Sequence, residues 1–315
     1  MDFKIVKYNN ELLDEWEKFI SESINGTIYH TREFLNYHPE GRFEDFSILI
    51  YDNDNIICVL PCCKTKDGFF SHKGATYGGP VFSASIYNTK NLDKIINLIF
   101  DYYENKIEFR ISSQIYHNIS IDILSYLLSQ KLKMTPELGW YISTDTDIIS
   151  SIKNSRNKKD LIKMKNNTEF LCGPTEEIED YYNFYHILSK NLQEKYNTLP
   201  THTLEEFIRI SNILKGKHLL YLVKKDNIIY GGVYVIKVTK KCWYTFYISR
   251  NSDINSPAII YLMYKIANDG KKDGVRYIDY GISTENGGKT LNMGLSSFKE
   301  LSLCGFPHNR YLFIN

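Results

Sequence analysis

Two kinds of hydrophobic pattern alternate along the first 145 residues of the chain. Apolar residues at every second position, or in short runs between turn residues, predict strands over 3–7, 46–51, 56–62, 107–112 and 140–144. Apolar residues spaced three and four apart predict helices over 10–20, with Asn10 as the cap, and over 31–37, 92–105 and 121–130. Ser71–Pro80 holds three glycines and a proline, which predicts a loop whose backbone approaches another group closely.

The order of patterns changes in the second half of the chain. Helices are predicted over 153–165, 176–196, 203–214 and 259–271, and strands over 168–172, 219–224, 228–238, 242–249 and 276–279. A chain of 315 residues is long enough for two domains with separate cores, which we place at 1–145 and 146–315. The expected fold class is α/β, with mixed sheets flanked by helices.

Composition and charge exclude several classes of function. Lys and Arg number 38 and Asp and Glu 37, so no global field attracts the protein to DNA or to an anionic membrane, and any polyanion contact must be local. Six cysteines without a Cys-x-x-Cys pair predict reduced core thiols, and the eight histidines suggest no metal site. Neither a signal peptide nor an apolar run of the roughly 18 residues that a membrane span needs is found, so we expect a cytoplasmic protein.

The first candidate site lies where the last predicted strand ends. Asp279 closes the strand, Gly281 supplies a turn, and Ser283 and Thr284 present two hydroxyls. Asp279 either orients or deprotonates an incoming amine, or caps the turn with its side chain. The hydroxyl of Ser283 either donates to an oxyanion or a sugar, or only stabilises the turn. Both alternatives stay open for each residue.

The glycine loop and a histidine are further candidates. The glycines allow backbone N–H groups to approach an anion or a sugar, and the alternative is a tight connection needed only for packing. The candidate ligand-contacting residues of the loop are His72, Lys73, Thr76, Tyr77 and Gly78. His202, which precedes the predicted N-cap Thr203, is either a general base or a structural histidine.

The helix predicted over 153–165 is strongly basic, with six basic residues against Asp160. Arg156, Lys159 and Lys163 recur on one face at helical spacing. Such a face is either solvated or in contact with phosphate groups, for example those of a tRNA.

Five motifs together carry a resemblance to a known family. They are Ser71-His72-x-Gly74-x-Thr76-Tyr77-Gly78-Gly79, the helix with Arg156, Lys158 and Lys159, Thr201-His202-Thr203, Asp279-Tyr280-Gly281-Ile282-Ser283-Thr284, and Phe298-Lys299. With the element order, they resemble the Fem-like (FemAB-related) branch of the GNAT acyltransferase superfamily over nearly the whole chain. These tandem-GNAT transferases build peptide bridges on peptidoglycan precursors or acylate amino sugars of surface glycans.

The resemblance implies two tandem GNAT-like domains, each a mostly antiparallel mixed sheet flanked by helices. Residues 1–145 would form the acceptor wall, and 146–315 the donor seat and the catalytic cleft. Phe298 and Lys299 would line the substrate groove beside Tyr280, with Lys299 at the phosphates of the acceptor. A surface ion pair remains the alternative role of Lys299. The candidate catalytic residues are Asp279, His202 and Ser283.

The donor seat departs from the GNAT pattern. GNAT enzymes hold the CoA pyrophosphate on a glycine-rich turn at a helix N-terminus, but Ser249–Ala258 contains no glycine. Ser256 as N-cap and Pro257 as first residue still predict a helix start. Arg250 and open amides could hold a phosphate, which Asp253 would oppose. The donor-binding candidates are Arg250, Ser256, Arg156 and Lys159.

We therefore expect an N-acyltransferase that forms an amide on an amino sugar of a cell-surface glycan precursor. Its co-substrate would be an acyl-CoA or a similar small acyl donor, with no tightly bound cofactor or metal. The acceptor would be a small molecule or a lipid- or nucleotide-linked precursor, which allows peripheral contact at the inner face of the cytoplasmic membrane. Two alternatives remain: transfer of an aminoacyl group from a charged tRNA to a peptidoglycan or glycan precursor, and a non-catalytic module that binds glycan precursors.

Overall fold

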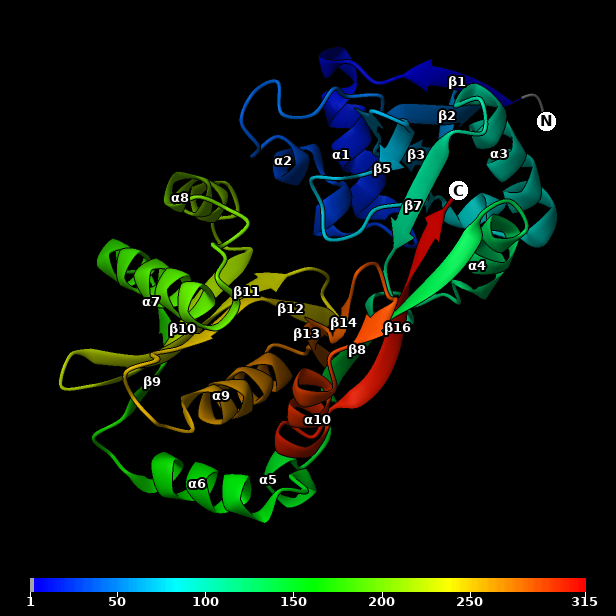
Figure 1. Ribbon diagram of the computed structural model, residues 1–315. Coiled ribbons are helices and arrows are strands. Elements are labelled where there is room, and N and C mark those ends of the chain that lie inside the picture. Colours follow the sequence, from blue (N-terminus) through cyan, green and yellow to red (C-terminus); the bar gives the residue numbers. More distant parts are fainter. Residues whose placement is uncertain (1–2) are drawn as a thin grey trace. The chain divides into compact units, whose positions relative to one another are not determined.

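The computed structural model describes residues 3–315, which form two compact units (Figure 1). Unit 1 contains the chain up to Leu138 together with 284–290 and 309–315, and unit 2 contains 139–283 and 291–308. The first two residues of the N-terminal segment in which no signal peptide was found, Met1 and Asp2, lie outside the described residues. Two of the crossings between the units fall inside strands, β8 (Lys133–Ser143) and β16 (Phe306–Ile314).

Unit 1 is built around two groups of strands. One group pairs antiparallel in the order β1-β2-β3-β6, and the other has the order β4-β5-β7-β16, with β5 and β7 parallel. The strands are β1 (Phe3–Lys7), β2 (Ile48–Asp52), β3 (Asn55–Leu60), β4 (Cys63–Thr65), β5 (Gly68–Ser71), β6 (Val81–Phe82) and β7 (Ile107–Ile111). The helices are α1 (Leu13–Glu22), α2 (Arg32–Leu35), α3 (Thr89–Tyr102) and α4 (Asp122–Ser129).

The core of unit 1 joins α3 to the strands. Leu92, Ile95 and Ile99 recur at helical spacing on one face of α3, and all three are buried. They belong to one cluster with Ile107 and Phe109, which occupy alternate positions of β7 and so share one face of the sheet. Burial of each such side chain contributes roughly 1.5–3 kcal/mol relative to exposure, which fixes the position of β7 and of the loop beside it.

Unit 2 contains a six-stranded sheet and the remaining helices. The strand order is β8-β13-β12-β11-β10-β9, in which β12 and β13 are parallel and the other pairs antiparallel. The strands are β9 (Leu171–Thr175), β10 (His218–Lys225), β11 (Ile228–Lys237), β12 (Cys242–Arg250) and β13 (Tyr277–Ile282). A separate short ladder, in the segment that returns to unit 1 at residue 284, joins β14 (Thr284–Glu285) to β15 (Thr290–Leu291). The helices are α5 (Ile148–Ser151), α6 (Ser155–Asn166), α7 (Ile178–Tyr196), α8 (Leu204–Ile213), α9 (Ala258–Lys272) and α10 (Met293–Ser302).

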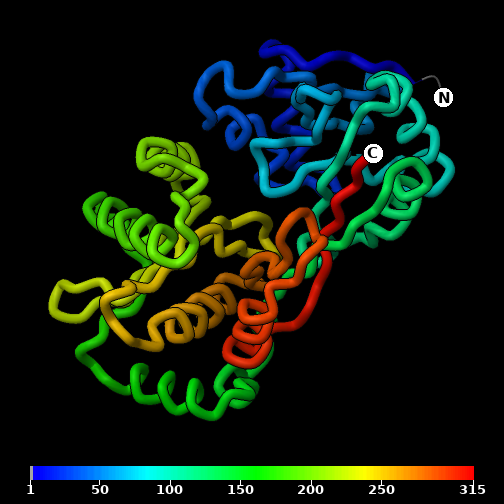
Figure 2. The backbone as a smooth tube through the Cα atoms, in the orientation of Figure 1, coloured from blue at the N-terminus to red at the C-terminus, as the bar shows by residue number. Residues whose placement is uncertain are grey.

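Helices cover both faces of the sheet in unit 2. Gly231 and Gly232 are neighbours in β11 and therefore point to opposite faces. A side chain at Gly231 would meet Ala258 of α9, and one at Gly232 would meet Phe184 of α7. The same arrangement is visible in the chain path, where α7 and α9 flank β11 (Figure 2). The sheet is therefore buried on both sides, and its strand ends carry the accessible positions.

The mixed α/β fold class is confirmed, with several local corrections. The first helix begins at Leu13 after a 3-10 turn whose cap is Asn9 rather than Asn10. Strand β3 ends at Leu60 because Pro61 has no N–H to donate to a ladder, and β4 and β5 were not predicted. Strand β9 begins at Leu171, since a turn closed by the Phe170 N–H and the Asn167 carbonyl precedes it.

The cysteines and the helices bear on two further expectations. All six cysteines are free thiols, and five of them are buried, as predicted for reduced core residues. Burial raises the pKa of Cys58, so this thiol stays protonated and unreactive at neutral pH. Across residues 3–315, the structure contains no helix with the length and apolar character of a membrane span.

Candidate active site

The parallel pairing of β12 and β13 is short, and it ends at the first candidate residue. Three pairs form, the last between Tyr244 and Asp279, although β12 continues to Arg250 and β13 to Ile282. Gly281 has φ of +76°, in the region that favours glycine, and its N–H donates to Asp279 Oδ1 at 2.6 Å. The backbone of β13 therefore turns just after Asp279, whose carboxylate caps the turn.

The carboxylate of Asp279 also faces a histidine that the sequence did not single out. His308 Nε2 of β16 lies 3.3 Å from Asp279 Oδ1, and both side chains are less than a tenth exposed. Gly139 makes this approach possible, because a Cβ there would lie 2.6 Å from His308 Nε2. The ring of Tyr141 packs edge-on against the imidazole, with 5.9 Å between centroids. The site therefore contains a buried Asp–His pair.

The hydrogen bond to Asp279 fixes the protonation pattern of a neutral His308. Because a carboxylate oxygen accepts, Nε2 carries the proton and Nδ1 keeps its lone pair. Nδ1 is buried and has no hydrogen-bond partner within residues 3–315. A buried acceptor without a partner is costly, so this nitrogen is suited to a ligand donor or a bound water.

An aromatic row extends from Asp279 to His202 along unit 2. Tyr244 packs on Phe246 with centroids 6.2 Å apart, and Phe246 lies 5.4 Å from the ring of His202. His202 Nδ1 is 2.6 Å from the hydroxyl of Tyr247, and burial raises the pKa of that hydroxyl. Tyrosine and phenylalanine faces of this kind suit stacking of a sugar or an acyl chain. The row connects two of the three predicted catalytic residues.

His202 itself is firmly held. Its carbonyl accepts from the hydroxyl of Tyr185 at 2.8 Å, and the next residue, Thr203, caps α8. The Thr203 side chain accepts from the Glu206 N–H, and the Glu206 carboxylate accepts from the Thr203 N–H. The predicted cap is thus present, and it places His202 at the end of the aromatic row.

Lys299 and Tyr280 occupy a different face of β13. Tyr280 follows Asp279 and so points the opposite way, where its hydroxyl donates to the carbonyls of Lys299 and Leu303 at 3.3 Å. Lys299 is buried, and its Nζ donates to the carbonyls of Gly281 and Ile282 at 3.0 and 2.8 Å. The surface ion pair considered for Lys299 is therefore wrong. Phe298, beside it on α10, is more than a third exposed.

Ser283 follows the turn and is almost completely buried. Its carbonyl accepts from the N–H of Asn292, which caps α10. Its hydroxyl has no hydrogen-bond partner in the part of the chain that the structure describes. The turn is therefore stabilised without this hydroxyl, which remains available to a ligand.

The glycine loop of unit 1 uses its amides internally. The N–H of Gly74 donates to His72 Nδ1 at 3.0 Å, that of Gly78 to the Arg110 carbonyl at 2.8 Å, and that of Gly79 to Ser71 Oγ at 2.9 Å. These amides are therefore not available to an anion or a sugar, contrary to what was expected from the sequence. The glycines instead allow close packing.

Other loop side chains differ in their exposure. Burial lowers the pKa of His72 to about 4, so the imidazole is neutral. Tyr77 is buried with its ring edge-on to Tyr29, and the carbonyl of Thr76 accepts from Arg310 at 3.3 Å. Lys73 is exposed, with its Nζ 4.0 Å from the centre of the Phe70 ring.

The donor candidates lie at two separate places of unit 2. Arg250 and Ser256 flank the loop before α9, whose N-cap is Pro257 rather than Ser256, because the carbonyl of Pro257 accepts the first N–H bonds of the helix. Lys190 Nζ lies 2.6 Å from both carboxylate oxygens of Asp253. The lysine charge therefore offsets the negative charge that was expected to repel a phosphate. Arg156 and Lys159 are exposed on α6 instead.

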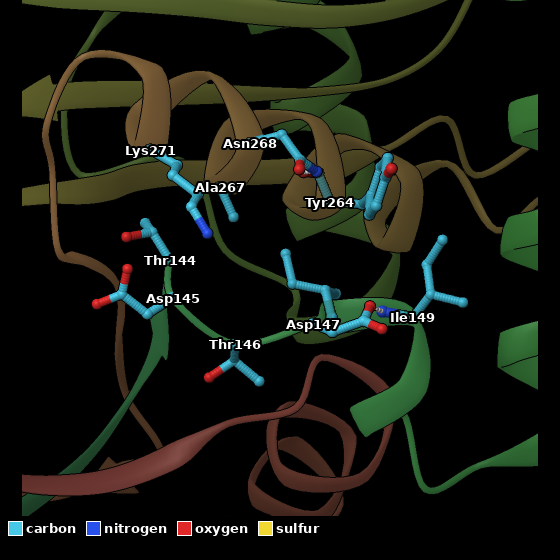
Figure 3. Close-up of a pocket in the computed structure, with 10 residues that line it drawn as sticks. Thr144, Asp145, Thr146, Asp147, Ile149, Tyr264, Ala267, Asn268 and Lys271 are labelled. Carbon is cyan, nitrogen blue, oxygen red and sulfur yellow. Dashed lines mark hydrogen bonds between the residues drawn. The ribbon is translucent and has the colours of Figure 1, made fainter.

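Two of the pockets formed by the described residues lie within unit 2. One, of about 230 Å³, is polar and lies between the segment 144–149 and α9 (Figure 3). Lys271, Asn268 and Tyr264 reach it from α9. The other, of about 540 Å³, lies between β10 and the ends of α7 and α8. Neither is lined by a residue that the sequence singled out, and the described residues contain no cluster of metal-binding side chains.

Comparison with known proteins identifies the fold. Neither the family models nor the curated proteins yielded a match. FemX matches over 99% of this chain and 97% of its own, with a TM-score of 0.69 and 12% identity. The lysylphosphatidylglycerol synthetase of Bacillus licheniformis matches over 98% of this chain and 92% of its own, with a TM-score of 0.63 and 13% identity. A tandem GNAT protein from the clavulanic acid biosynthesis pathway matches over 99% of this chain and 97% of its own, with a TM-score of 0.53 and 8% identity. The predicted Fem-like tandem GNAT fold is confirmed.

Proposed function

We propose that the protein is an acyltransferase that forms an amide on the amino group of a glycan precursor, with an acyl-CoA as the donor. The observation that carries this proposal is the buried Asp279–His308 pair at the point where the β12–β13 ladder ends, beside an aromatic row. A transferase of this kind needs a group that takes a proton from the amine and a surface that holds the acyl group. The fold and these residues support both requirements.

In the proposed reaction, the neutral amine attacks the thioester carbonyl. A C–N bond forms and the C–S bond breaks, and the amine proton passes to His308 Nδ1 and from there to the departing thiolate. Asp279 holds the imidazole in the required orientation and stabilises its charged form. The hydroxyl of Ser283 is the proposed donor to the oxyanion that develops on the carbonyl oxygen. Chain residues therefore account for each proton and each developing charge.

An aminoacyl-tRNA donor is the second candidate. It is favoured by the likeness to a protein named for the synthesis of lysylphosphatidylglycerol, which carries a lysyl group. In that case an ester C–O bond breaks instead of the thioester C–S bond, and the roles of Asp279 and His308 are unchanged. The acyl-CoA donor is preferred because Lys190 compensates the charge of Asp253 in the loop beside Arg250.

The donor is tested with purified protein, an amino sugar such as glucosamine, and either acetyl-CoA or charged tRNA. We expect release of free thiol from acetyl-CoA, and Asp279→Asn and His308→Gln should each lower its rate by about 10²- to 10⁴-fold. His186→Gln, an exposed histidine of α7, is the matched control and should keep the rate. Deacylation of tRNA without thiol release would select the second donor. No transfer from either donor would identify a non-catalytic module.

A further inference from the structure

Helix α6 has a buried face and a basic face. Leu161 and Met164 are buried, and Arg156, Lys159 and Lys163 recur on the opposite side, where all three are exposed. The ion pair of Arg156 with Asp160 spans 3.9 Å with an 87% exposed arginine, so solvent screens it and the positive charge remains. The helix therefore presents a row of cations away from the body of unit 2.

Apolar side chains are exposed next to these cations. Ile162 lies between Lys159 and Lys163 in α6 and is 38% exposed. Helix α10 adds Leu301, which is 38% exposed and whose carbonyl accepts from the N–H groups of Lys153 and Asn154. Lysine and arginine alone would suit a solvated helix. Contact of the exposed aliphatic side chains with water is unfavourable, so they favour burial against an apolar partner.

Hydrogen bonds join the end of α10 to the start of α6 within unit 2. The carbonyl of Leu301 accepts from the N–H groups of Lys153 and Asn154 at 3.1 and 3.2 Å, just before α6 begins. In the first turn of α6, the amide of Asn157 donates to Ser302 Oγ at 2.6 Å. Leu301 therefore extends the exposed surface formed by Ile162 and the cations of α6.

We propose that this surface, the α6–α10 face, docks the protein on an anionic lipid bilayer. Arg156, Lys159 and Lys163 match the negative charge of the headgroups, while Ile162 and Leu301 enter the boundary with the acyl chains. A nucleic acid would satisfy the cations and leave the aliphatic side chains in water, so the bilayer fits the whole face better. The proposal does not depend on the proposed function, because it concerns binding and no chemical step.

The test is sedimentation of the full chain with vesicles of phosphatidylcholine alone or with about 30% phosphatidylglycerol, at low and high salt. We expect binding to the anionic vesicles only, and weaker binding at high salt. The double variant Arg156→Glu/Lys159→Glu should lower the partition coefficient by about 30-fold or more, since each basic residue near a charged surface contributes to binding. Both positions are exposed and away from the buried Leu161 and Met164, so the double variant should keep the fold.

The matched control is Lys90→Glu/Lys94→Glu, which makes the same charge change on exposed positions of α3 and should bind like the parent protein. Ile162→Ser should weaken binding by about threefold at every salt concentration, because it removes apolar contact and no charge. The proposal is overturned by equal binding to neutral and anionic vesicles, by equal losses in the two double variants, or by unchanged binding of Ile162→Ser. Binding of RNA without binding of vesicles also overturns it.

Discussion

The glycine loop of unit 1 and the strand end of unit 2 both combine glycine with polar residues, but they differ in what their polar atoms do. In the loop, the amides of Gly74, Gly78 and Gly79 all donate to groups within unit 1. At the strand end, Ser283 Oγ and His308 Nδ1 are buried without a hydrogen-bond partner in the described residues. Amides that already donate within the protein need no ligand, whereas buried polar atoms without partners are suited to one.

The two segments also use glycine for different reasons. A Cβ at Gly78 would lie 2.6 Å from the Ser71 carbonyl oxygen and 2.9 Å from the His72 nitrogen, so two backbones touch there. At Gly281 the nearest atom is the hydroxyl of Tyr244 at 3.2 Å, and φ of +76° is what requires glycine. The first glycine permits packing and the second permits a turn. Glycine content alone therefore does not locate a binding loop.

The largest effect on stability is expected for Gly78→Ala. The added Cβ meets backbone atoms, which cannot rotate away, so the free energy of unfolding should fall by about 3 kcal/mol. Urea denaturation measures this change. Gly173→Ala is the matched control, because a Cβ there meets nothing within 4 Å, and it should change stability by less than about 0.5 kcal/mol. Equal, small effects of both substitutions would show that the loop is loose, and would reopen a ligand-binding role for its backbone.

Much of this comparison could be foreseen from sequence, and the misses have physical causes. Strand β13, although it runs to Ile282 instead of ending at Asp279, and the cap at Thr203 follow from local patterns, because strand periodicity and capping act over a few residues. The pairing of His308 with Asp279 depends on Gly139, and these three residues are far apart in sequence. No local signal contains that contact.

The interpretation of the glycine loop failed for a related reason. Glycines predict that a backbone approaches something closely, but the identity of the partner depends on the tertiary fold. Here the partners are Ser71 and Ile111 of the same unit. Lys299 is a similar case, because the sequence shows a cation but cannot show that two carbonyls of the neighbouring strand end surround it.

A smaller effect is expected from the histidine of the loop. Burial holds the pKa of His72 at about 4, with the Asp45 charge acting in the opposite direction and those of His38 and Arg32 reinforcing it. The unfolded chain takes up this proton near pH 6.5, so stability is complete above that pH and falls as the pH approaches 4. At pH 5, the low pKa of His72 should therefore reduce the free energy of unfolding by about 2 kcal/mol relative to neutral pH.

Hydrogen exchange of unit 1 peptides at pH 7.5 and 5, corrected for the intrinsic rates, measures this dependence. His72→Gln removes the titrating group, so the loss of protection between the two pH values should be smaller by that amount, whatever the stability of the variant at pH 7.5. His186→Gln, at an exposed position, should leave the dependence unchanged. A variant with the parental pH dependence would mean that His72 is accessible to protons, and the loop would no longer count as a closed segment.

The smallest effect on stability is expected at the strand end, for Ser283→Ala. Its hydroxyl makes no hydrogen bond within residues 3–315, so its removal breaks none and should change the free energy of unfolding by less than about 0.5 kcal/mol. If the hydroxyl instead serves a ligand, the same substitution should slow acyl transfer by at least about tenfold, as loss of an oxyanion donor does. Thermal unfolding and a thiol-release assay on one preparation separate the two readouts. A loss of stability above 1 kcal/mol with an unchanged rate would make Ser283 a packing residue like those of the loop, and the contrast between the two segments would disappear.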